Sequence, residues 1–391
     1  MRILLVHNRY KQYGGEDSTF DAEKTLLESR GNIVQTIVFT NNEIEGLLSK
    51  IKTGIRLFFN LKSAILIKKR ILDFKPDIIH VHNFFYTASP SIFYAAKRLK
   101  IPVVVTLQNY RLICSGSLLL RDLKPCSICV GQKFPFSGIK HKCHRGSSME
   151  TANITFMTGV HKLLNTWQKQ IDQFIAVTEF AKGIYVNSSL KLTAERIVVK
   201  PNSVEDVNLD NIANRDLCFL YVGRLSEEKG ITTLLKAFID SEYLIEIIGD
   251  GPLRNLVEDA ATYHSNIRYQ GYKDRTFIIS RLKKCKALIM PSIWYECLPI
   301  TILEAFSTGT PIIISDIGNL NTIVTDGYNG LHFKTNDPND LLRKVDQFVH
   351  NQHKYLELYK NARQTYLSRY THEINYENLM TIYNSLILKK G

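Results

Sequence analysis

Short apolar strands alternate with helical segments along this chain of 391 residues, and the alternation constrains the fold more than any other feature. It indicates parallel βαβ units, in which ligands bind at the carboxyl ends of the strands. The length allows two domains of ordinary size, and an apolar share of 45% is enough for two cores. Six strands are expected in the first domain: Ile3–His7, Ile33–Phe39, Asp77–Val81, Val103–Thr106, Phe174–Val177 and Ile197–Lys200.

A change in composition marks the boundary between the domains. The first set of strands ends at Pro201-Asn202-Ser203, and residues 205–215 are polar and typical of a linker. We therefore expect a first domain over residues 1–204 and a second over residues 205–371. Residues 112–148 form a cysteine-rich insert in the first domain, and residues 376–390 have a helical pattern.

Two carboxylates, Glu296 and Glu304, follow a short apolar run. Pro299 is tolerated at the first position of a helix, because its missing N–H would have no partner there, so we expect a helix to start at Pro299. The free N–H groups of Ile300 and Thr301 would then face an anion, with Glu304 about one turn further along. Two glutamates at this spacing usually lie on a solvated helix face, so the neighbouring motifs decide between the two interpretations.

The stretch from Glu296 to Glu304, with Leu298 and Pro299 inside it, resembles the Glu-x7-Glu signature of the retaining glycosyltransferases of family 4. The resemblance implies an α/β architecture of the GT-B type, with two Rossmann-like parallel-sheet domains that face each other across a cleft. It implies that the helix at residues 376–390 returns to the first domain. It also implies that Glu296 holds the sugar hydroxyls and Glu304 the ribose or the sugar-phosphate junction, with Leu298 in the nucleotide-binding loop.

A glycine turn at residue 223 follows an apolar strand and is flanked by Arg224 and Lys229. Two cations beside a helix N-terminus would neutralise a diphosphate, and the family resemblance gives these two residues that role. It further places Gly249 and Gly251 in a turn that lines the nucleotide site, and Tyr272 beside the base. Asn321-Thr322 stand where the family usually has Pro-Glu, so a polar contact near the donor is expected to differ.

The first domain offers weaker signals. By resemblance, Gly15 belongs to a glycine pair whose backbone closes over the donor phosphate. His80 and His82 lie at strand spacing on one side, which is compatible with a metal site, a catalytic imidazole or a buried hydrogen-bonded pair. The resemblance favours His82 as the residue beside the reacting sugar. Gln108 replaces a histidine that relatives often have.

The positive charge of the chain lies in the first domain. Residues 1–205 have 29 Lys and Arg against 15 Asp and Glu, whereas residues 206–391 have 21 against 22. The electrostatic field of such an excess of basic residues attracts nucleic acid or an anionic membrane. From Lys50 to Leu72, apolar residues at helical spacing are interleaved with basic ones, a pattern that suits a membrane interface and equally a packed helix with snorkelling lysines.

Four of the seven cysteines lie close together in the sequence, at Cys114, Cys126, Cys129 and Cys143. The Cys-x2-Cys pair with two outlying cysteines matches tetrahedral zinc ligation. Free thiols are the alternative. The insert that contains them has little apolar periodicity. Such a segment needs a cross-link or a bound ion to stabilise it, so we expect a structural metal.

Together these features predict a retaining glycosyltransferase that moves a hexose-type sugar from a UDP-, GDP- or dTDP-sugar to an acceptor hydroxyl, in polysaccharide or glycolipid biosynthesis on a lipid-linked acceptor. No catalytic metal is expected. The chain has no apolar run of about eighteen residues and no signal-peptide core, so we expect a cytoplasmic protein, peripheral on the inner face of the cell membrane.

Two alternatives stay open. The nearer is another GT-B enzyme, either a nucleotide-sugar epimerase or a sugar phosphorylase. The more distant is a zinc-stapled, basic nucleic-acid-binding protein. It lacks a recognition helix of known type and leaves Glu296 and Glu304 without a purpose, so we expect no nucleic-acid partner.

Overall fold

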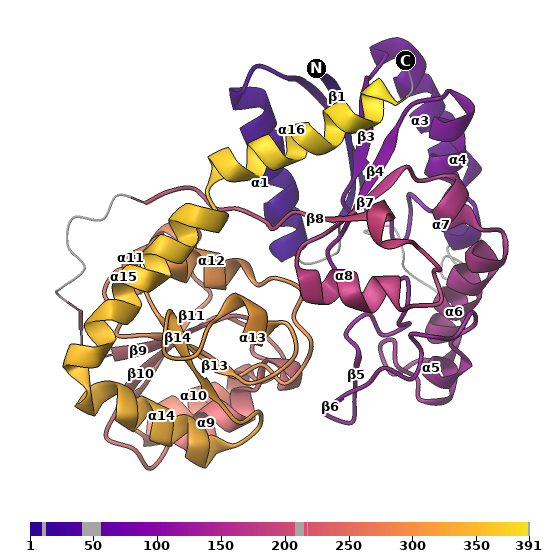
Figure 1. Cartoon of the computed structure of the whole chain (residues 1–391). Coiled ribbons are helices and arrows are strands. Elements are labelled where there is room, and N and C mark those ends of the chain that lie inside the picture. Colours follow the sequence, from indigo (N-terminus) through magenta and orange to yellow (C-terminus); the bar gives the residue numbers. More distant parts are fainter. Residues whose placement is uncertain (10–12, 41–55, 208–214, 217, 390–391) are drawn as a thin grey trace. The chain divides into compact units, whose positions relative to one another are not determined.

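The computed structural model describes residues 1–9, 13–40, 56–207, 215–216 and 218–389, which form two compact units (Figure 1). Unit 1 comprises Met1–Leu119, Cys126–Asn202 and Asn375–Gly391, and unit 2 comprises Leu120–Pro125 and Ser203–Ile374. The chain thus passes from one unit to the other after Asn202, and most of its last helix belongs to unit 1.

A six-stranded parallel sheet forms the centre of unit 1, in the order β2-β1-β3-β4-β7-β8. Ile3 of β1 lies opposite Val34 of β2 and Ile78 of β3. β4 is buried along its whole length, as expected for a parallel sheet covered on both faces. The strands are β1 (Arg2–Arg9), β2 (Ile33–Thr40), β3 (Ile78–Val81), β4 (Val103–Leu107), β7 (Gln173–Ala176) and β8 (Ile197–Val199).

Helices from both ends of the chain cover this sheet. Leu379 and Tyr383 of the last helix lie in one buried cluster with Phe20 of the first. The helices of unit 1 are α1 (Gly15–Ser29), α3 (Leu61–Phe74), α4 (Ser91–Arg98), α5 (Phe136–Lys140), α6 (Ser148–Leu163), α7 (Thr166–Lys169), α8 (Glu179–Val186), η1 (Ala194–Arg196) and α16 (His372–Leu388).

A second six-stranded parallel sheet forms the centre of unit 2, in the order β11-β10-β9-β12-β13-β14. Its strands are β9 (Cys218–Val222), β10 (Leu244–Ile248), β11 (Ile267–Gly271), β12 (Leu288–Met290), β13 (Ile312–Ser315) and β14 (Gly330–Phe333). Its helices are η2 (Glu227–Lys229), α9 (Ile231–Phe238), α10 (Arg254–Tyr263), α11 (Arg275–Leu282), α12 (Ile300–Ser307), α13 (Leu320–Ile323), α14 (Pro338–His350) and α15 (Gln352–Arg369).

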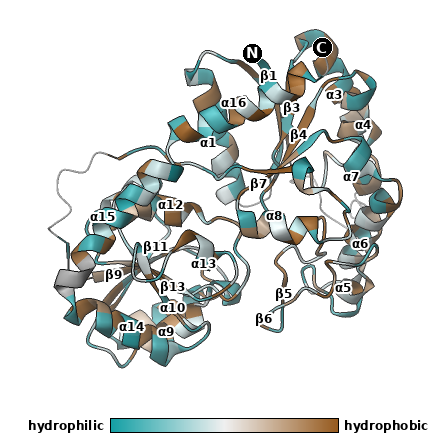
Figure 2. Ribbon diagram, viewed as in Figure 1, coloured by the Kyte–Doolittle hydropathy of each residue, from teal (hydrophilic) through white to brown (hydrophobic). Residues whose placement is uncertain are grey.

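The six strands expected in the first domain are confirmed, with ends that differ by two residues at most. Figure 2 shows why they could be recognised: the central strands are mostly apolar, whereas the helices carry both apolar and polar residues. Within the described residues, no helix combines the length and the apolar character needed to cross a bilayer.

Candidate active site

The carboxyl ends of β9 and β12 meet where the strand order of unit 2 reverses. β10 and β11 lie on one side of β9, and β12, β13 and β14 on the other. In open parallel sheets, ligands bind at such a reversal, outside the carboxyl ends of the two adjoining strands. Arg224 and Lys229 follow β9 and Glu296 follows β12, so the topology brings three predicted site residues to this edge.

Lys229 and Glu296 form an ion pair, with Nζ 2.6 Å from Oε1. The hydroxyl of Ser292 and the indole N–H of Trp294 donate to the same oxygen, at 2.8 and 2.9 Å. The Glu296 side chain is 5% exposed and that of Lys229 is 24% exposed. Three donors therefore fix the carboxylate, while the half-buried ammonium stays within reach of a ligand.

Asn319 holds the backbone on which Glu296 stands. Its Nδ2 donates to the carbonyl oxygen of Glu296 at 3.2 Å and to that of Cys297. The hydroxyl of Thr322 lies 3.0 Å from Asn319 Oδ1 and donates to it. Thr322 therefore orients the Asn319 side chain.

α12 begins at Ile300, and the expectation that it starts at Pro299 is wrong. Pro299 is the N-cap, with an extended ψ of 126°, so helical geometry begins one residue later. The first N–H groups of a helix have no acceptor within it, which still applies to Ile300 and Thr301. Leu298, just before the cap, is buried.

Glu304 lies in the middle of α12 and is 5% exposed. Burial raises the pKa of this carboxyl, and the hydrogen bond and charge of Arg275 oppose the increase. The Nε of Arg275 donates to Glu304 Oε1 at 3.0 Å, and its side chain is about half exposed. Each of the two predicted acids therefore has one cationic partner.

Gly249 lets two turns come into contact. A Cβ on this residue would lie 1.8 Å from the carbonyl oxygen of Gly223, so no other residue fits there. At Gly251 a Cβ would lie 2.5 Å from the carbonyl oxygen of Leu225. The turns after β9 and β10 thus form one layer of closely packed backbone at the candidate site.

Arg224 and Tyr272 lie on the surface of this region. Arg224 is exposed, although Tyr221 fixes its backbone by donating from Oη to the Arg224 carbonyl oxygen at 2.8 Å. Tyr272 is 78% exposed and directly follows Gly271. Packing does not hold either side chain, in contrast to Glu296.

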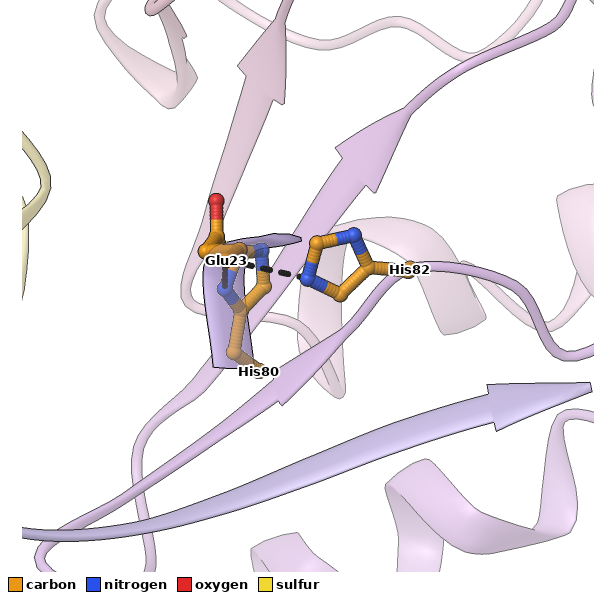
Figure 3. Close-up of side chains that lie close together, drawn as sticks. All are labelled: Glu23, His80 and His82. Carbon is orange, nitrogen blue, oxygen red and sulfur yellow. Dashed lines mark hydrogen bonds and ion pairs between the residues drawn. The ribbon is translucent and has the colours of Figure 1, made fainter. Parts of the chain in front are cut away.

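In unit 1, Glu23, His80 and His82 lie together and are buried (Figure 3). Glu23 Oε1 is 2.9 Å from His80 Nδ1 and 3.0 Å from His82 Nε2. Among the described residues, these are the one set of three or more potential metal ligands whose ligand atoms all lie within 4.8 Å of one another.

The surrounding contacts favour a buried hydrogen-bond network over a metal site. Lys200 Nζ donates to Glu23 Oε2 at 2.9 Å, and Tyr383 Oη lies 2.7 Å from His80 Nδ1. Burial alone would raise the pKa of Glu23, but Lys200 and the two histidines hold it well below its usual range. The ammonium of Lys200 already balances the carboxylate, so a metal ion would add uncompensated positive charge.

His82 is buried in this network, with Nε2 3.0 Å from Glu23 Oε1. Burial lowers its pKa, and the charge of Glu23 opposes the decrease. With Nε2 directed at Glu23, Nδ1 is buried and has no hydrogen-bond partner within the described part of the chain. Only the Nδ1 edge of the ring is left for the predicted contact with a sugar.

Gly15 is the exposed first residue of α1. Glu16, which follows it, accepts a hydrogen bond at 2.7 Å from the amide of Asn109, in the segment after β4. Burial raises the pKa of Glu16. Gln108, also in this segment, exchanges amide hydrogen bonds of 3.2 and 3.3 Å with Asn202. The start of α1 is therefore tied to the segment after β4.

Residues 204–365 match the model of the family described as glycosyl transferases group 1. The match lies entirely within unit 2. An uncharacterized glycosyltransferase of Methanocaldococcus jannaschii is 30% identical over 195 residues, which are 49% of this chain and 54% of that protein. The O-antigen chain mannosyltransferase C of Escherichia coli is 25% identical over 281 residues, 66% of this chain and 75% of that protein. The chain thus spans about half the length of the first of these relatives.

Solved structures match almost the entire chain. HepE of Anabaena, in complex with UDP, has a TM-score of 0.68 with 16% identity and covers 99% of this chain and 100% of its own. Sucrose-phosphate synthase of Thermosynechococcus elongatus has a TM-score of 0.71 with 16% identity and covers 99% of both chains. These likenesses show the fold, which is GT-B, as the family resemblance implied.

Sequence reasoning missed the residues that orient the two acids. Arg275 lies 29 residues before its partner Glu304, and nothing local marks it. Trp294 and Ser292 could have been predicted from the sequence. An indole N–H and a hydroxyl within four residues of an acid can both donate hydrogen bonds to it.

Proposed function

We propose that this protein is a retaining glycosyltransferase of family 4 that transfers a hexose-type sugar from a nucleoside-diphosphate sugar to an acceptor hydroxyl. The observation that carries the proposal is the Lys229–Glu296 pair at the strand-order reversal of unit 2, inside the region that matches group 1. Arg224 and Lys229 neutralise the diphosphate, and Glu296 accepts hydrogen bonds from the sugar hydroxyls.

The chemistry in this proposal rests on positioning and charge stabilisation. The acceptor attacks on the face from which the diphosphate leaves, through an ion pair with oxocarbenium character, and the departing phosphate takes the acceptor proton. The N–H groups of Ile300 and Thr301 add partial positive charge beside the leaving group. Glu304 contacts the ribose or the sugar-phosphate junction, and His82 orients the sugar. No catalytic metal takes part.

The nucleotide lies along the glycine turns in this proposal. Gly249 and Gly251 leave room for the nucleoside, Tyr272 packs on the base, Leu298 lines the loop, and the backbone at Gly15 approaches the phosphate. UDP-, GDP- and dTDP-sugars are the donors to test. A thermal-shift screen of all three ranks them, because a ligand that binds only the folded state raises the melting temperature.

Two relatives support an acceptor in polysaccharide synthesis. One is the E. coli O-antigen mannosyltransferase. The other is an uncharacterized 42.6 kDa protein in the cps region of Klebsiella pneumoniae, 22% identical over 352 residues, which are 82% of this chain and 86% of that protein. The proposed acceptor is a glycan carried on a lipid.

The outer face of α3 supports access to such an acceptor at the inner face of the cell membrane. Leu61 and Ile65 on this helix are 66% and 65% exposed. Exposed lysines lie beside them at positions 62, 68 and 69, whereas Ile67 and Ile71 are buried on the opposite side. Part of the predicted amphipathic stretch, residues 50–55, lies outside the described residues. An apolar face with lysines beside it suits an anionic membrane surface.

Donor turnover with and without an acceptor tests the enzymatic proposal. We expect sugar transfer to a polyprenyl- or glycolipid-linked glycan, with the anomeric configuration of the donor retained in the product, as observed by NMR. Conversion of the donor to its epimer without acceptor would indicate an epimerase. Cleavage of a glycosidic bond that requires inorganic phosphate and yields a sugar phosphate would indicate a phosphorylase. A product with the inverted anomeric configuration would refute retention.

Vesicle sedimentation tests the membrane proposal separately. The variant Lys62→Glu, Lys68→Glu, Lys69→Glu should bind anionic vesicles more weakly than wild type at low salt, because each cation near the surface contributes about 1 kcal/mol. The matched control Lys236→Glu, Arg268→Glu, Lys284→Glu changes three exposed cations of unit 2 and should bind like wild type. Equal sedimentation with neutral and anionic vesicles would contradict the proposal.

A further inference from the structure

Four cysteines converge from three segments of the insert at residues 112–148. Cys114 lies in the loop after β4, Cys126 and Cys129 follow the short hairpin of β5 (Leu120–Arg121) and β6 (Lys124–Pro125), and Cys143 follows α5. These segments contact one another through the backbone: the N–H of Cys126 donates to the carbonyl oxygen of Leu119 at 2.7 Å, and that of Cys143 donates to the carbonyl oxygen of Gly138 at 3.0 Å. All seven cysteines are thiols, without disulfides.

The loops fit tightly around these thiols. A Cβ on Gly116, two residues after Cys114, would lie 3.3 Å from the Cβ of Cys143. A Cβ on Gly138 would lie 3.2 Å from both side-chain atoms of Ser115. The segment after Cys114 is thus packed against α5 and the residues that lead to Cys143.

The insert has little else to hold its shape. Its buried large aliphatic side chains are only Leu112, Ile113 and Leu119 within residues 112–148, all of which are described. Six of its non-glycine residues have the left-handed backbone conformation, which costs energy: Ser117, Leu119, Asp122, Leu123, Lys142 and Arg145. A segment with so small a core needs another source of stability.

We propose that Cys114, Cys126, Cys129 and Cys143 bind one zinc ion as a closed, tetrahedral structural site. Four thiolates including a Cys-x2-Cys pair form a ligand set that zinc prefers. The neighbouring histidines are not ligands: His141 is exposed, and His144 Nε2 lies 2.5 Å from Tyr86 Oη. The site goes beyond the proposed transfer reaction and does not depend on it.

Zinc binding should tighten the insert. Within the described chain, no three of these sulfur atoms all lie within 4.8 Å of one another. Zn–S bonds are about 2.3 Å long, so a zinc ion needs the sulfur atoms closer together. The sulfur atoms must therefore move inward around the ion. Because Asn109 connects the same loop to Glu16 at the start of α1, the ion also braces the region around Gly15.

Metal analysis of the full chain, purified in reducing buffer without chelator, tests the proposal. We expect about one zinc per chain. After removal of zinc, added Co²⁺ should give the absorption bands of tetrahedral thiolate coordination. Cys126→Ser and Cys129→Ser should lose the metal, whereas Cys218→Ser and Cys285→Ser, which alter buried cysteines of unit 2, should retain it.

These measurements remain decisive even if the cluster variants fail to fold, because metal content and the Co²⁺ spectrum are measured on the wild-type chain. Failure of the wild type to bind zinc or cobalt would overturn the proposal. So would zinc that persists in the double variant Cys126→Ser, Cys129→Ser, or the discovery of disulfides among the four cysteines by thiol titration of the unfolded, unreduced protein.

Discussion

Each unit contains a buried glutamate paired with a lysine, and the two pairs differ in the exposure of the lysine. In unit 1, Lys200 lies 2.9 Å from Glu23 and its side chain is 2% exposed. In unit 2, Lys229 lies 2.6 Å from Glu296 and its side chain is 24% exposed. The first lysine is enclosed by protein, whereas the second can bind a ligand without losing its partner.

The same chemistry therefore serves two purposes. A fully buried pair has lost its hydration, so removal of one member leaves an uncompensated charge and weakens the fold. A partly exposed pair beside a helix N-terminus and closely packed glycine turns can exchange protein contacts for phosphate contacts. We infer that the Lys200 network maintains unit 1 and that the Lys229 pair serves the ligand.

The largest expected effect is on the buried network. Lys200→Met should lower the free energy of unfolding of unit 1 by about 3–5 kcal/mol, because it leaves the Glu23 carboxylate buried without its cation. Trp167, which is fully buried in unit 1, reports this unfolding by fluorescence. The double variant Glu23→Gln, Lys200→Met should lose less. A Lys200→Met protein as stable as wild type would refute the assigned role.

The next effect is on catalysis. Glu296→Gln should reduce transfer by about 100-fold or more, because a positioned charged contact with the transition state is lost. Glu304→Gln should have an effect of similar size. Both should unfold at nearly the wild-type denaturant concentration. Near-native turnover in both variants would remove the two acids from the active site.

A smaller effect concerns pH. Burial lowers the pKa of His161, so the folded form binds fewer protons than the unfolded form below about pH 6.5. The contribution of this residue to stability is therefore complete at neutral pH and decreases as the pH falls, by up to about 2 kcal/mol at pH 5. His161→Gln should flatten the dependence of unfolding free energy on pH, whereas the exposed His350→Gln should not. Equal slopes in the two variants would contradict a neutral buried His161.

The smallest effect is expected on the outside of α1. Lys24 and Glu28 form an exposed pair at 3.8 Å on the helix that carries Glu23. Lys24→Met should change the free energy of unfolding by less than about 0.5 kcal/mol, because water screens such pairs. A loss comparable to that of Lys200→Met would show that exposure does not distinguish the pairs.

Local patterns predicted the strands of both units and the glycine turns of unit 2, but not the buried network of unit 1. The strands and glycine turns of unit 2 depend on local patterns, and Lys229 and Glu296 each lie directly after such a pattern. Glu23 and Lys200 are 177 residues apart, and Tyr383 joins the network from the last helix. Only the order of the strands brings these residues together, and local periodicity does not specify that order.

The prediction that α12 starts at Pro299 was wrong by one residue, for a local reason. A proline fixes φ but leaves ψ open, so it suits the N-cap as well as the first helical position. The partners of the two acids could not be predicted in full, since Arg275 approaches Glu304 through tertiary structure alone.

The central claim is that the Lys229–Glu296 edge of unit 2 binds a nucleoside diphosphate. Trp294 and Trp167 are the two tryptophans of the chain, and the Trp294 ring lies 5.3 Å from Lys229 Nζ, so a Trp167→Phe protein has one reporter beside the site. Titration with UDP, GDP and dTDP should change its fluorescence saturably for at least one of them. Lys229→Met should weaken that binding by about 10-fold or more, since hydrogen bonds to charged groups contribute about 1.5–3 kcal/mol, while the exposed control Lys236→Met should bind normally. No fluorescence change with any diphosphate, together with no binding by calorimetry, would contradict the claim, as would equal affinities in the two variants.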